Sequence, residues 1–157
     1  MEDSWADLHV HTNASDGLWS PADVVQKAAE AGLDAVGVVD HDTMAGVKQA
    51  VAAGRIHGIE VVPGIEFSSE YRGKDLHIIG YYLKADHLRL KEYLDLFMKE
   101  RWRRAEKMIR NLNRRGVKLT LADVMRKTEG RVVGRPHLAE VLMEKGYVET
   151  FSEAFHR

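Results

Sequence analysis

The first 67 residues alternate between short apolar runs and helical segments, and this alternation restricts the fold more than any other feature. Residues 34–39 form a continuous apolar run, which is typical of a strand buried on both faces. Further strands are expected at 5–11 and at 59–67, the second of them interrupted or bulged at Pro63-Gly64. Because helical segments separate these strands, the order predicts a parallel sheet with helices packed over it.

The two helical segments carry recognisable start and stop signals. Ser20 is suited to cap a helix that has Pro21 in its first turn, and Gly32 ends the apolar pattern that follows. A second helix is expected over about 44–55.

A return strand is expected after the third strand. The polar turn at 71–75 is short, which favours an antiparallel partner strand over 76–83. Folding the chain about this turn places His77 near Ser68, one diagonal step from Glu66.

The second half of the sequence has a purely helical pattern. Residues 1–84 hold 13 acidic and 6 basic side chains, whereas residues 85–157 hold 11 acidic and 17 basic ones. An acidic, histidine-rich half suits cations and a basic half suits anions such as phosphates, although the basic half also fits a set of solvated helices. Helices are expected over 87–115, 121–127 and 137–145, with a short one from about 149.

Side chains that bind metals gather where the expected strands end. Ligands of parallel α/β structures bind at the carboxyl ends of strands. Cysteine is absent, so a metal would be held by histidine and carboxylate side chains alone. The candidate ligands are His9, His11, Asp16, His41, Glu66 and His77. A chance histidine pair on a half-exposed strand is the alternative for His9 and His11, but it does not explain the same placement at three strands.

These residues resemble the motifs of the PHP (polymerase and histidinol phosphatase) family. The resembling segments are Asp7-Leu8-His9-Val10-His11-Thr12, Asp16-Gly17, Val39-Asp40-His41-Asp42, Pro63-Gly64-Ile65-Glu66, Leu76-His77-Ile78-Ile79-Gly80-Tyr81 and, more loosely, Gly134-Arg135-Pro136-His137-Leu138-Ala139. The pattern is most similar to the stand-alone branch that acts on nucleotides and short RNA. The resemblance implies an α/β fold, in which 1–84 is the N-terminal part of a distorted (β/α)₇ barrel and 85–157 is an all-helical insertion that covers the substrate.

The resemblance also implies roles for individual side chains. His9, His11 and Glu66 would hold one divalent ion, Glu66 and His77 a second, and Asp16 with His41 a third. Asp40 would orient its neighbours rather than bind an ion. Family members continue with further strands that carry an Ala-His-Pro-like motif and a terminal Asp-x-His, and residues 138–157 match neither. We therefore expect an incomplete barrel, whose metal site a missing C-terminal segment or a second chain would complete.

The expected chemistry is hydrolysis by metal-activated water. Neither cysteine nor a Ser-His-Asp arrangement offers a protein nucleophile. Mixed histidine and carboxylate ligands suit Mn²⁺, which we favour, or Zn²⁺ or Fe²⁺, and two or three such ions are expected.

Arg135 and His137 are the candidate substrate-binding residues, and His137 is also a candidate catalytic group. Pro136 in the first turn of a helix leaves backbone N–H groups available to an anion, and Arg135 can grip phosphate with two donors. An ordinary helix start beside a surface arginine is the alternative. The basic run 99–107 would guide an RNA backbone or form a solvated helix face.

The expected function is hydrolysis of a phosphate monoester on a nucleotide 3′,5′-bisphosphate, or trimming of short RNA from its 5′ end. The partner would be a phosphorylated small molecule or a short oligonucleotide. A catalytically idle metal- or nucleotide-binding module and a metal-dependent amidohydrolase are the alternatives. Neither a signal peptide nor a membrane-length apolar run is visible in the sequence, so a cytoplasmic location is expected.

Overall fold

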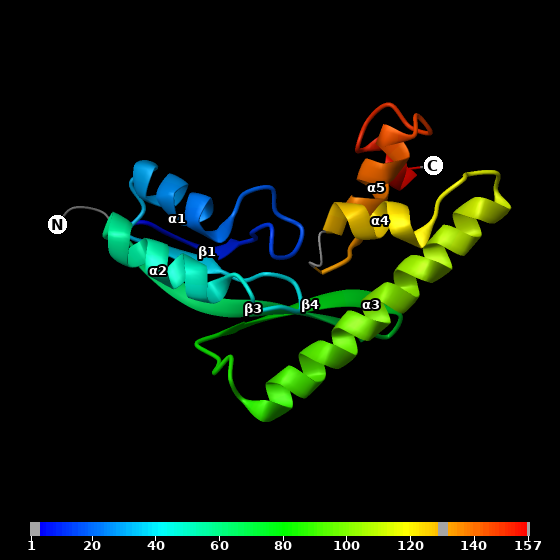
Figure 1. Cartoon of the computed structure of the whole chain (residues 1–157). Helices are drawn as coiled ribbons and strands as arrows, with labels where there is room; N and C mark the ends of the chain where they lie inside the picture. The colour runs from blue at the N-terminus through cyan, green and yellow to red at the C-terminus, as the bar shows by residue number, and fades with distance from the viewer. Residues whose placement is uncertain (1–3, 129–131, 157) are drawn as a thin grey trace. The chain divides into compact units, whose positions relative to one another are not determined.

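The computed structural model describes residues 4–128 and 132–156 (Figure 1). The chain divides into two compact units, Met1–Leu94 and Asp95–Arg157. The division falls inside a long helix.

A four-stranded mixed sheet forms the centre of the N-terminal unit. Its strands follow the order β1 (Ala6–Val10), β2 (Ala35–Val38), β3 (Glu60–Tyr71) and β4 (Lys74–Tyr81). β1, β2 and the first part of β3 are parallel, and β4 returns antiparallel to β3. The predicted α/β order and the antiparallel return strand are confirmed, including the pairing of Ser68 with His77.

Two helices cover this sheet with a shared apolar core. α1 (Pro21–Glu30) begins as predicted, because Ser20 Oγ accepts a hydrogen bond from the backbone N–H of Asp23 at 3.2 Å. α2 (Val47–His57) begins three residues later than predicted and ends at Gly58, whose φ of 69° is left-handed. The core joins both helices to β2 through Val24, Val25, Ala28, Ala50, Ala53, Val36 and Val38.

β3 changes its partner strand at Pro63-Gly64 without a break. Residues up to Pro63 pair with β2, and residues from Gly64 pair with β4. The predicted interruption or bulge at this dipeptide is therefore wrong, since β3 is continuous and neither of its pairings shifts register there. A Cβ on Gly64 would lie 2.7 Å from Val39 Cγ1 and 3.0 Å from Tyr81 Cδ1, so the crowded crossover requires glycine. Glu66 consequently lies inside β3 and not at its end.

β1 contains a bulge beside the first candidate ligand. Asp7 pairs with Val36 and Val10 pairs with Val38. Between these two pairs β1 therefore contains one residue more than β2 does. A Cβ on Gly37 would lie 2.7 Å from the carbonyl carbon of Leu8, which explains the glycine there. The Tyr81 hydroxyl donates to the Leu8 carbonyl at 2.9 Å, which is a side-chain contact between the two edge strands of the sheet.

The second unit is helical throughout its described residues. α3 (Leu88–Arg114) enters it from the first unit, and α4 (Leu121–Thr128), α5 (Arg135–Glu144) and the short α6 (Glu153–His156) follow. All four lie close to their predicted positions, although α5 begins two residues early and α6 begins about four residues late. Their core is formed by Ala105, Ile109, Leu119, Val124, Val133, Leu138, Val141, Leu142 and Val148. None of the helices in the described part of the chain is long and apolar enough to cross a membrane.

Candidate metal centre

The six predicted ligands come together in the N-terminal unit. β1 supplies His9, and His11 follows one residue after its end; the other four lie in the loop after β1, after β2, in β3 and in β4. Three overlapping groups have ligand atoms within 4.8 Å of one another: His9, His11 and Glu66; His11, Asp16 and His41; His41, Glu66 and His77. The sequence therefore identified side chains that the fold gathers at one place.

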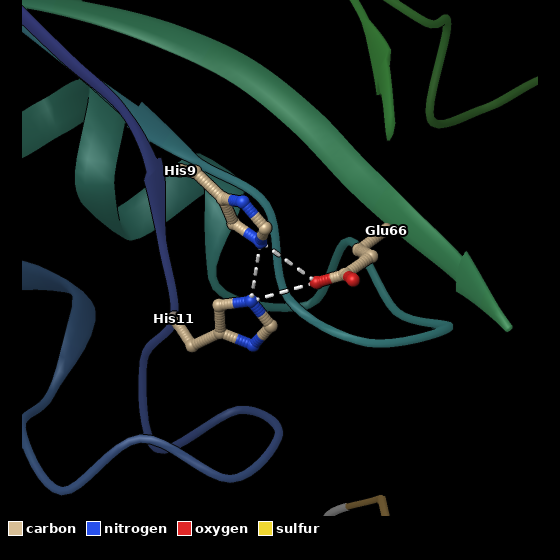
Figure 2. A group of neighbouring side chains, drawn as sticks. All are labelled: His9, His11 and Glu66. Carbon is tan, nitrogen blue, oxygen red and sulfur yellow. Dashed lines mark hydrogen bonds and ion pairs between the residues drawn. The ribbon is translucent and has the colours of Figure 1, made fainter. Parts of the chain in front are cut away.

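Glu66 is the centre of this cluster. Its Oε2 lies 3.0 Å from His9 Nε2 and 2.8 Å from His11 Nε2, as Figure 2 shows. Its other oxygen, Oε1, lies 2.7 Å from His77 Nδ1. The side chain is almost wholly buried. Its two carboxylate oxygens face histidines that come from opposite edges of the sheet.

Asp16 extends the cluster on the side of the loop after β1. Its Oδ1 lies 3.0 Å from His11 Nδ1, and its Oδ2 lies 3.7 Å from His41 Nε2. His11 thus approaches Glu66 through one ring nitrogen and Asp16 through the other. The His41 ring stands edge-on to the rings of His11 and His77, with centroids 4.6 and 4.8 Å away.

The charges of the cluster shift the pKa values of its members. Burial raises the pKa of Asp16, but the hydrogen bond with His11 and the nearby His41 outweigh burial and lower it to about 2. Burial lowers the pKa of His11, but its hydrogen bond to Asp16 and the charges of Asp16 and Glu66 raise it overall. For Glu66, burial is outweighed by the hydrogen bond with His9 and the charge of His41, so its pKa is lowered. Both carboxyl groups are therefore held in the anionic form that binds cations.

The donor set fits a divalent transition metal. Four imidazoles and two carboxylates converge, and cysteine is absent. Imidazole nitrogen together with carboxylate oxygen suits Mn²⁺, Zn²⁺ or Fe²⁺, whereas Ca²⁺ prefers oxygen ligands alone. Since His11, His41 and Glu66 each belong to two groups, neighbouring ions would share ligands.

Asp40 is buried and binds the loop that carries Asp16. It is 1% exposed. Its Oδ1 accepts hydrogen bonds from the Thr12 backbone N–H and from Ser15 Oγ, and its Oδ2 accepts one from Thr12 Oγ1, each at 2.7 Å. Ser15 Oγ also lies 3.2 Å from Asp16 Oδ1. The sequence prediction included Asp40 but missed Thr12 and Ser15. The two hydroxyl side chains close after the first strand are the feature that could have indicated hydrogen bonds to a nearby carboxylate.

The two candidate substrate residues lie in the helical unit, at the start of α5. Arg135 is exposed and lines a groove of about 320 Å³, which also has Arg115 and several apolar side chains in its wall. His137 is 6% exposed. The Gly134 backbone N–H donates to His137 Nδ1 at 3.1 Å, so the ring caps the helix start, a role that the sequence did not predict. If His137 contacts substrate, it would do so through its other ring nitrogen, Nε2.

Comparisons with known proteins show what this chain is similar to. The family model described as PHP domain matches residues 7–149. A 5′-3′ exoribonuclease of Haemophilus influenzae is 32% identical over 151 residues, which are 96% of this chain and 55% of the relative. A 3′,5′-nucleoside bisphosphate phosphatase of Chromobacterium violaceum is 28% identical over 152 residues, 96% of this chain and 53% of the relative.

A solved structure is similar over nearly the whole chain. It belongs to a Bifidobacterium adolescentis protein described as a candidate metal-dependent phosphoesterase. The two are 29% identical with a TM-score of 0.90, over 98% of this chain and 54% of that chain. The chain thus spans about half the length of the relatives it matches.

Proposed function

Since this chain belongs to the PHP domain family, we propose that it forms the metal centre of a phosphoesterase that acts on nucleotides or short RNA. The observation that carries the proposal is the convergence of His9, His11, Asp16, His41, Glu66 and His77 on one place in the N-terminal unit. Phosphoryl transfer depends chiefly on positioning and on stabilising negative charge, and a cluster of this kind is suited to both.

The side chains divide this work among them. Bound divalent ions, with Mn²⁺ favoured over Zn²⁺ or Fe²⁺, would polarise the phosphate and lower the pKa of water from 15.7 to about 7. His9, His11 and Glu66 would hold one ion, Glu66 and His77 a second, and, where a third ion binds, Asp16 and His41 would hold it. Asp40 fixes the loop of Asp16 through the hydroxyls of Thr12 and Ser15.

A nucleotide 3′,5′-bisphosphate is the first candidate substrate, and the 5′ end of a short RNA is the second. The names of these two relatives support one substrate each. Arg135 supports both, because an exposed guanidinium at the start of α5 can bind a phosphate group with two donors. The same feature favours phosphate esters over the amide substrates of a metal-dependent amidohydrolase.

A phosphate-release assay tests the proposal. The chain is incubated, with Mn²⁺ or with EDTA, with 3′-phosphoadenosine 5′-phosphate, from which free phosphate is measured, or with a 5′-phosphorylated short RNA, from which released nucleoside monophosphates are measured. We expect Mn²⁺-dependent release that His9→Ala abolishes. Arg135→Ala should raise KM about 10-fold with little change in kcat, since a phosphate contact that is equal in ground and transition states contributes to binding alone. Arg89→Ala is the matched control, because Arg89 is an exposed arginine of α3 that lies outside the basic run 99–107.

Each other outcome identifies an alternative. Stoichiometric Mn²⁺ without turnover of either substrate indicates a metal-binding module that is idle by itself or needs a further segment or a second chain. Hydrolysis of amides without phosphate release indicates the amidohydrolase. Absence of bound Mn²⁺ contradicts the proposed function.

A further inference from the structure

We propose that Asp42 is a positioning residue of the metal centre, which aligns His41 and Glu66 by extending the edge of β3 with its own side chain. The proposal rests on the proposed function, because it gives Asp42 a purpose in metal binding. Among the described residues, Asp42 belongs to none of the three groups that could hold an ion. It lies directly after His41 in the sequence and is 2% exposed.

β3 needs a partner beyond the point where β2 ends. β2 stops at Val38, which pairs with Pro63, yet β3 continues through Glu66 and Ser68. In this stretch one edge of β3 is paired with β4. The opposite edge, which continues the side paired with β2, still presents backbone N–H and C=O groups, and buried groups of this kind require hydrogen-bond partners.

Residues 40–42 provide these partners in the pattern of a parallel strand. The Glu66 N–H donates to the Asp40 carbonyl at 3.1 Å, and the Asp42 N–H donates to the Glu66 carbonyl at 3.0 Å. His41 and Glu66 form an isolated parallel bridge between these two bonds. This bridge sets two candidate ligands opposite each other.

The Asp42 side chain makes the next bond along the same edge. The Ser68 N–H donates to Asp42 Oδ1 at 2.8 Å, where in a regular parallel strand the backbone carbonyl of residue 42 itself would have been the acceptor. The backbone cannot do so, because Asp42 has a φ of 51° and turns the chain away from β3. Aspartate is among the few residues that tolerate this left-handed conformation and still offer an acceptor.

Together these bonds fix the positions of three candidate ligands relative to β3. Asp42 holds Glu66 through its backbone and Ser68 through its side chain, and Ser68 is paired with His77 across β3 and β4. His41 precedes Asp42 and cannot slide along β3 while both bonds are made. The positions of His41, Glu66 and His77 therefore depend on an acceptor at residue 42.

Three substitutions separate the acceptor from the backbone conformation. Asp42→Asn keeps an amide oxygen and tolerates positive φ. Asp42→Gly keeps the backbone freedom but removes the acceptor, and Asp42→Ala loses both. Arg72→Gly is the matched control, because Arg72 has a φ of 53° at the exposed turn between β3 and β4.

Titration of the metal-free chain with Mn²⁺, followed by the electron paramagnetic resonance signal of the free ion, measures the consequence. We expect Asp42→Gly to weaken binding about 10-fold or more, the usual effect of losing a residue that orients metal ligands, and Asp42→Ala at least as much. Asp42→Asn should stay within about 3-fold of the parent chain, well short of that effect. Parent-like binding by Asp42→Gly, or equal losses in Asp42→Asn and Asp42→Gly, would overturn the proposal.

Hydrogen exchange in the absence of metal keeps this inference distinct from the proposed function. The Ser68 amide should exchange about 10-fold faster in Asp42→Gly than in the parent chain or in Asp42→Asn, while amides in the centre of α1 remain unchanged. Unchanged protection of Ser68 would refute the role of Asp42 even if the parent chain bound Mn²⁺. A parent chain that binds no Mn²⁺ but shows the exchange difference would refute the proposed function and leave Asp42 as a residue that aligns an unoccupied cluster.

Discussion

At the residue scale, the centre depends on buried carboxylates that are surrounded by histidines. Glu66 and Asp40 are both buried, but they act differently. Glu66 meets the rings of His9, His11 and His77, whereas Asp40 accepts three hydrogen bonds from Thr12 and Ser15. A carboxylate saturated by hydrogen-bond donors orders a loop, and one that faces imidazoles attracts a cation.

The His11–Asp16 pair predicts how the stability of the metal-free protein depends on pH. The raised pKa of His11 adds stability that is complete below about pH 6.5 and is lost as the pH rises through the folded-state pKa. The lowered pKa of Asp16 adds stability that is present above about pH 3.8 and is lost as the pH falls through about 2. We expect the free energy of unfolding to fall more between pH 6 and pH 8 in the parent chain than in Asp16→Asn.

Urea denaturation in EDTA at several pH values measures this difference. Equal slopes in the two proteins would show that the pair does not form in solution. With Mn²⁺ present the trend reverses, since a proton on His11 competes with the ion and binding tightens as the pH rises.

At the element scale, the sequence predicted the order of the strands and helices but not their irregularities. Periodicity and turn residues placed every strand and helix of the N-terminal unit, and the prediction that Ser68 pairs with His77 is confirmed. The change of partner at Pro63-Gly64 was mistaken for an interruption, because proline and glycine give the same local signal in both cases. Only the neighbouring strands distinguish them.

The candidate site was predictable to a similar degree. Residue types and their placement relative to the expected strands identified the six possible ligands, because chemistry and spacing are local properties, although Glu66 lies inside β3 and not at its end. The hydrogen bonds of Thr12, Ser15 and Asp42 join residues up to 28 positions apart, so they were invisible without the fold. The helix cap made by His137 is local, but Gly134 before it gives no side-chain capping signal.

The bulge in β1 makes Gly37→Ala a sensitive substitution. The added methyl group would press on the backbone of Leu8, directly beside His9. We expect a loss of about 1–3 kcal/mol in the free energy of unfolding, as for other overpacked sites, together with weaker Mn²⁺ binding. Urea denaturation and Mn²⁺ titration measure the two effects. Parent-like values for both would mean that the close approach of β1 and β2 at Gly37 does not occur.

At the scale of the whole molecule, the candidate metal centre is contained in one of the two units. All six ligands lie within Met1–Leu94, whereas Arg135, His137 and a separate apolar core lie within Asp95–Arg157. Metal binding is therefore a property that we assign to the first unit and phosphate recognition one that we assign to the second. Relatives about twice as long carry further residues beside this shared region.

Anomalous X-ray diffraction from a crystal of the chain grown with Mn²⁺ shows directly whether the cluster binds an ion. We expect at least one anomalous peak within bonding distance of Glu66, His9 and His11, which disappears in His9→Ala. Peaks confined to other parts of the molecule, or none at all from a crystal saturated with Mn²⁺, would contradict the proposed metal centre.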